Sequence, residues 1–84
     1  MNQPLAAAAV CLERACDDYQ SGSNAAAREQ LQLAVGALQQ SGFAETAALV
    51  VELAGVHSRA QRDESLEQLA GLCTSWASQR EVDA

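Results

Sequence analysis

The chain has 84 residues, a net charge of −6 and 49% hydrophobic residues, of which few are aromatic. A chain of this length makes at most one domain, and its five arginines are scattered, so it lacks the basic stripe of a nucleic-acid-binding protein. The negative charge also disfavours binding to an anionic membrane, and no apolar run approaches the roughly 20 residues that a membrane span needs.

Alanine and leucine dominate the composition, with 18 and ten residues. Both are strong helix formers and β-branched residues are few, so we predict an all-α fold for residues 1–84. No basic stretch precedes the apolar residues near the N-terminus, as it would in a signal peptide, and we expect a cytoplasmic protein. The odd number of cysteines argues against a disulfide framework, and we expect Cys16 and Cys73 to face the core.

The first helix is predicted over residues 4–20. Pro4 suits the first helical position, because its fixed φ and missing N–H cost nothing there. Apolar residues then recur at steps of four and three, which defines one helical face: Leu5, Ala9, Leu12, Cys16 and Tyr19. The polar run from Ser21 to Asn24 ends this pattern, and we expect Asn24 to cap the next helix.

The second helix is predicted over residues 24–41, and its core face carries Ala27, Leu31, Ala34, Val35 and Leu38. Gly42 suits the left-handed position that follows a helix, and Phe43 stands where a Schellman motif makes its hydrophobic contact. This is the clearest helix end in the sequence.

The third helix is predicted over residues 44–57. It is apolar nearly all round, so it must be covered on several sides. Its core stripe is expected to hold Leu49, Leu53 and Val56, followed by Ala60 in the same phase.

The fourth helix is predicted over residues 63–79. Its stripe of Leu66, Leu69, Cys73 and Trp76 is turned by about 140° from the stripe of the third helix, so a turn is expected within residues 57–62. Asp63 would then cap the fourth helix, and the polar tail at 80–84 would fray. Short links between successive helices make them antiparallel neighbours. The expected architecture is a small four-helix antiparallel bundle or a set of tetratricopeptide-like hairpins.

No residue set in the sequence carries an enzymatic mechanism, a cofactor or a metal. His57 is the only histidine, and it has no ligand partners at metal-binding spacing. The residues after it do not match a histidine phosphotransfer domain. The stretch Asp63-Glu64-Ser65-Leu66 invites comparison with acyl carrier proteins, but Glu64 intervenes between aspartate and serine, and the position is too near the C-terminus. We therefore expect a protein that is not an enzyme.

The two middle helices resemble a degenerate tetratricopeptide hairpin. The large–small alternation that carries the resemblance comprises Leu31, Ala34, Val35 and Leu38, then Ala47, Val51 and Ala54. Packing of any two helices produces such patterns as well. The stretch from Leu38-Gln39-Gln40-Ser41-Gly42 through Glu45, Ala48 and Val50 to Leu53 is also similar to the tetratricopeptide-like chaperones of type III secretion needle subunits. That resemblance implies a short, helical, non-enzymatic cytosolic chaperone that holds an aggregation-prone partner in a groove.

The second and third helices carry more apolar surface than one core face can bury. Val50 and Val51 lie about 100° and 200° around the helix from Leu49, and Leu33 lies about 200° from Leu31. Exposed apolar patches usually mark binding surfaces. We therefore predict that a partner protein binds at Leu33, Phe43, Val50, Val51, Leu72 and Trp76. The alternative is that a helix buried on all sides uses these residues internally.

The predicted function is that of a small adaptor or chaperone that sequesters a partner protein, its amphipathic helix lying in an apolar groove. A needle subunit is the partner that the resemblance implies. An inhibitor or antiactivator of a regulatory protein and a structural homodimer are the alternatives among interaction proteins. A phosphotransfer or carrier domain is the alternative from another class, and the motif mismatches disfavour it.

Overall fold

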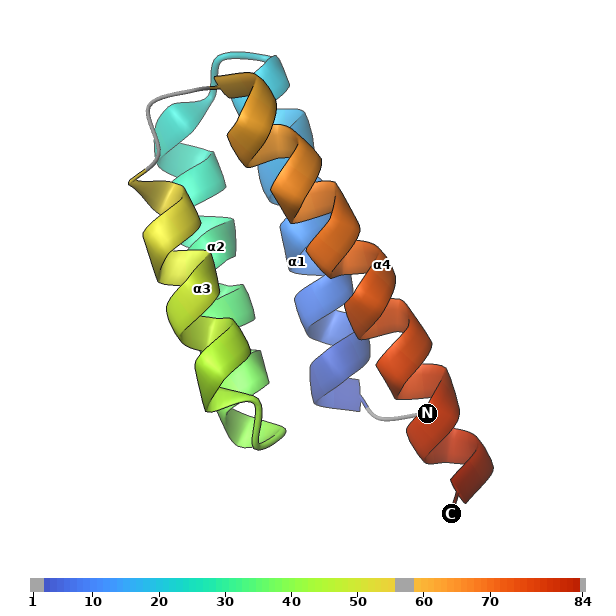
Figure 1. The fold of residues 1–84 in the computed structure, drawn as a ribbon. Coiled ribbons are helices and arrows are strands. Elements are labelled where there is room, and N and C mark those ends of the chain that lie inside the picture. Colours follow the sequence, from blue (N-terminus) through green and yellow to red (C-terminus); the bar gives the residue numbers. More distant parts are fainter. Residues whose placement is uncertain (1–2, 56–58, 84) are drawn as a thin grey trace.

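The computed structural model describes residues 3–55 and 59–83, and these residues form four helices and no strand. The helices are α1 (Gln3–Gln20), α2 (Asn24–Gln40), α3 (Ala44–Ala54) and α4 (Arg59–Asp83). They run alternately up and down, so that each is antiparallel to the next (Figure 1). The molecule measures 39 × 19 × 19 Å. The predicted all-α class and antiparallel four-helix bundle are confirmed.

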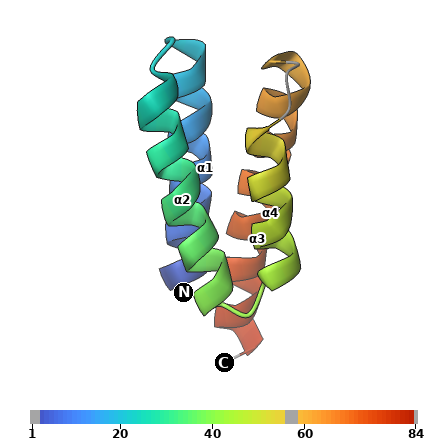
Figure 2. The ribbon, with the colours of Figure 1, turned by 90° about the vertical axis from the view of Figure 1, so that its left-hand side faces the viewer.

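The four helices are not equally well packed. α1 packs along both α2 and α4, whereas α3 packs chiefly against α2 and meets α4 over a much smaller area. Figure 2 looks onto α2 and α3, with α1 and α4 behind them. α3 therefore has a full neighbour on one flank only.

The core face of α1 is the one that the sequence predicted. Its five predicted residues are all at most 4% exposed, and two alanines between them, Ala8 and Ala15, are fully buried as well. At the far end of this face the guanidinium of Arg62, on α4, lies 3.5 Å from the centre of the Tyr19 ring. Arg62 Nε also donates to Asp63 Oδ1 at 3.3 Å. The contact between Arg62 and Tyr19 joins the N-terminal part of α4 to α1.

Two Schellman motifs end the first two helices. Gly42 has a φ of +83°, Phe43 N donates to Leu38 O at 2.9 Å, and Gly42 N donates to Gln39 O at 3.1 Å. The prediction for Gly42 is therefore confirmed. Gly22, with a φ of +87°, ends α1 in the same way. Because that motif fixes where the chain turns, Ser23 precedes α2 and Asn24 is its first residue, so the predicted Asn24 cap is wrong.

The boundary between α3 and α4 differs from the prediction. α3 ends at Ala54, and α4 begins at Arg59, four residues before the predicted start, so Asp63 lies inside the helix and does not cap it. Arg62, in the first turn of α4, lies over the ring of Tyr19, so this turn contacts α1. α4 also continues to Asp83, past the predicted end at residue 79. Val56 and His57 lie outside the described residues.

Candidate functional site

The face that α3 turns to the core is not the predicted one. Ala47 and Val50 are 1% and 0% exposed, whereas Leu49, expected in the core stripe, is 43% exposed. Leu53 is half-buried. α3 packs chiefly on α2, and the face that it buries carries Ala47 and Val50. The predicted core position of Leu49 and the predicted surface position of Val50 are therefore both wrong.

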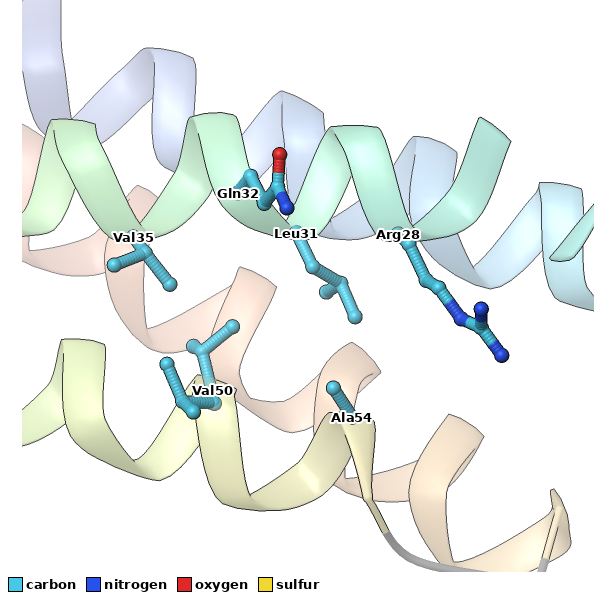
Figure 3. Close-up of a pocket in the computed structure, with 7 residues that line it drawn as sticks. Arg28, Leu31, Gln32, Val35, Val50 and Ala54 are labelled. Atoms are coloured by element: carbon cyan, nitrogen blue, oxygen red, sulfur yellow. The ribbon is translucent and has the colours of Figure 1, made fainter. Parts of the chain in front are cut away.

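This orientation leaves an apolar groove of about 360 Å³ between α2 and α3 (Figure 3). Leu31 and Val35 from α2 face Val50 and Ala54 from α3 across it. Val50 and Leu31 are buried and form its floor, while Val51 is 60% exposed at its rim. We call this surface the α2–α3 groove; it is lined by Arg28, Leu31, Gln32, Val35, Val50, Val51 and Ala54.

Arg28 is the one ionisable residue in this lining. It is exposed, and it lies at the same end of the groove as Ala54 (Figure 3). Within the part of the chain that the structure describes, its guanidinium has no carboxylate partner. An apolar groove with one unpaired cation at its end suits a ligand that is apolar along its length and acidic at one end.

The opposite flank of α3 carries a second apolar surface. At one end the rings of Phe43 and Trp76 stack, with centroids 4.8 Å apart and planes inclined by 12°. At the other end Leu53 lines a hollow of about 380 Å³ with Gln61, Glu64, Ser65 and Gln68 of α4. Two leucines lie on the helices between these points, Leu49 and Leu72, and they are 43% and 46% exposed. We call this surface the α3–α4 seam.

The structure divides the six predicted partner-binding residues among three places. Val50 and Val51 line the α2–α3 groove, while Phe43, Leu72 and Trp76 belong to the α3–α4 seam. Leu33 is 60% exposed, but it lies about 200° around α2 from Leu31 and is not part of the groove lining.

Sequence reasoning missed Arg28, Val35 and Ala54 as groove residues, and Leu49 as a seam residue. The Leu31–Val35 and Val50–Ala54 pairs are spaced by four on the two arms of one antiparallel hairpin. That spacing alone does not identify the groove, because α3 carries another apolar pair at the same spacing, Leu49 and Leu53.

The buried cysteines are neutral thiols. Burial, followed by the nearby carboxylates of Asp63 and Glu67, raises the pKa of Cys16 to about 11, and burial raises the pKa of Cys73 as well. Both side chains lie in the core, as predicted. Within residues 3–55 and 59–83, no cluster of histidine, cysteine and acidic residues is arranged to hold a metal ion. No described helix combines the length and the apolar character needed to cross a bilayer.

Comparison with known proteins yielded no relative: no protein-family model matches the chain, and neither a curated protein nor a solved structure matches it significantly.

Proposed function

We propose that this protein is a cytosolic adaptor or chaperone that binds a helical segment of a partner protein in the α2–α3 groove. The observation that carries the proposal is the apolar lining of the groove, with Val51 60% exposed at its rim. Amphipathic helices bind such grooves through apolar residues spaced by three and four.

The dimensions of the groove limit the length of the partner segment. α3 has 11 residues, which span about 16 Å at 1.5 Å per residue. A partner helix of about three turns covers this length and presents three or four apolar anchors. An acidic residue at one end of that helix would pair with Arg28. A helical secretion needle subunit is one candidate partner, by the resemblance of the sequence to needle-subunit chaperones.

Site-specific photo-crosslinking tests this proposal. A photoreactive amino acid at position 51 is expected to crosslink one discrete protein in native lysate, identified by mass spectrometry. The same amino acid at position 33 is the control, because Leu33 and Val51 are each 60% exposed but only Val51 lines the groove.

The crosslink should be lost when the helical segment of the identified partner is added in purified form as a competitor. Equal crosslinking from both positions, or none from position 51, would contradict binding in the groove. Co-expression with a needle subunit tests that candidate separately, because the groove can bind a different partner.

A further inference from the structure

The α3–α4 seam has one row of side chains on each helix, and Gln68 is the polar member of the row on α4. On α4, Leu72 lies one turn from Gln68 and one turn from Trp76, so the three share a face. On α3, Leu49 lies one turn before Leu53. Trp76 stacks on Phe43 and Gln68 lines the hollow with Leu53, so both ends of the α4 row are anchored to α3. Leu49 and Leu72 are therefore exposed apolar side chains on the flank where α3 and α4 meet.

Carboxylates border this surface. Glu45 lies one turn before Leu49, and Glu52 lies three residues after it. On α4, Glu64 lines the hollow beside Leu53. All three glutamates are exposed, and none forms an ion pair with another described residue.

Within residues 44–54 and 60–78, no cation balances these charges. Between residues 44–54 and 60–78 the only basic residue is Arg62. Arg62 lies over the Tyr19 ring and pairs with Asp63, so it is turned toward α1. The seam thus combines exposed leucines with a rim of negative charge, and such a rim favours a positively charged partner.

We propose that the α3–α4 seam is a second docking surface, which binds a cationic amphipathic helix. Apolar residues of that helix would pack on Leu49, Leu53 and Leu72, and its flanking lysines or arginines would pair with the glutamate rim. A second copy of this chain does not fit, because it brings a net charge of −6 and the same glutamates. This proposal does not depend on the α2–α3 groove, because the seam lies on the other flank of α3.

A synthetic peptide tests the proposal on the full-length protein. The peptide has roughly 14 residues, which span about 21 Å as a helix, with leucines spaced by three and four, arginines on both flanks and no aromatic residue. Trp76 is the only tryptophan and lies at the end of the seam, so its emission reports binding directly. We expect saturable binding that weakens as salt is added, since exposed ion pairs are screened.

Two matched pairs of variants separate the seam from general charge attraction. E45Q/E52Q/E64Q is expected to weaken peptide binding about tenfold, as three exposed ion pairs are lost. The control E13Q/D17N/E67Q removes three exposed carboxylates at a hollow between α1 and α4 and should change binding by less than about twofold. Leu72→Ser should weaken binding about tenfold, whereas Val10→Ser, at an equally exposed position on α1, should not.

Circular dichroism of each variant confirms that its helices are intact. The proposal is overturned if the peptide does not bind saturably, if both triple variants weaken binding equally, or if Val10→Ser has the effect of Leu72→Ser. Val51→Ser, in the groove, should leave peptide binding unchanged. Failure at the seam therefore leaves the groove proposal standing, and a failed crosslink at position 51 leaves this one standing.

Discussion

α1 and α3 are both rich in apolar residues, but they use them differently. α1 buries seven residues, and Val10 is its one large apolar side chain that is exposed. α3 buries only Ala47 and Val50 and leaves Leu49 and Val51 exposed. The difference follows from their neighbours, since α1 packs along two helices and α3 along one. Burial here is set by the position of a helix in the bundle, and not by how apolar it is.

The comparison also explains why both candidate surfaces flank α3. A helix that is apolar nearly all round buries one face when it has one full neighbour. Its other apolar side chains then lie at the surface on both sides of that face. In this protein they border the α2–α3 groove on one flank and the α3–α4 seam on the other.

The largest expected effect is the difference in stability between a leucine-to-alanine substitution on α1 and one on α3. Leu12→Ala, on α1, should lower the free energy of unfolding by about 2–5 kcal/mol, because Leu12 is fully buried. Leu49→Ala, on α3, should change it by less than about 1 kcal/mol, because Leu49 is 43% exposed. Urea unfolding followed by circular dichroism measures both. Similar losses in the two variants would mean that α3 is as fully packed as α1.

A smaller effect is expected at the turn that joins α2 to α3. Gly42→Ala should cost about 1 kcal/mol, since φ at this position is +83° and a Cβ is penalised there. Gly36→Ala is the control, because Gly36 lies inside α2 and a Cβ there would meet no atom within 4 Å. It should stabilise the protein by about 0.5–1 kcal/mol. The two glycine-to-alanine substitutions should thus change the free energy of unfolding, measured by urea melts, in opposite directions.

The sequence predicted the parts of the fold where one local signal decides the structure. The face of α1 follows from the spacing of its large side chains, because Leu5, Leu12 and Tyr19 recur every seven residues on one side of the helix. The end of α2 follows from Gly42, because few other residues tolerate a left-handed conformation. For these elements, local chemistry and tertiary packing favour the same structure.

The sequence could not predict the orientation of α3. Because this helix is apolar nearly all round, several faces satisfy the periodicity equally well. The choice is made by tertiary packing, in which α3 lies chiefly against α2 and buries Ala47 and Val50. The first turn of α4 also makes a tertiary contact that the local sequence does not reveal, because Arg62 lies over the ring of Tyr19, far away in the chain. The candidate site lies around α3, so the same ambiguity in the orientation of the helix affected the predicted site residues.

An effect that depends on pH is expected at Cys16 on the buried face of α1. Its pKa in the folded protein is about 11, above the ordinary value of 9.0, so the fold favours the neutral thiol. The stability that this contributes should be complete below about pH 9 and should be lost as pH rises through the folded pKa. Urea melts between about pH 8 and pH 11 should therefore show a steeper loss for the wild-type protein than for Cys16→Ala. Parallel pH profiles would show that Cys16 is more accessible to water than the structure indicates.

The most direct test of the proposed binding at α3 compares Val51→Asp with Leu33→Asp. Both residues are 60% exposed, so both variants should keep the helical circular dichroism and the melting temperature of the wild-type protein within a few degrees. The partner protein is the one that crosslinks to the photoreactive amino acid at position 51. After purification, it should bind the Leu33→Asp variant normally and should fail to bind the Val51→Asp variant. Two results would contradict the account. If Val51→Asp unfolds, Val51 is part of the core; if it folds and still binds the partner normally, the partner does not bind in the groove.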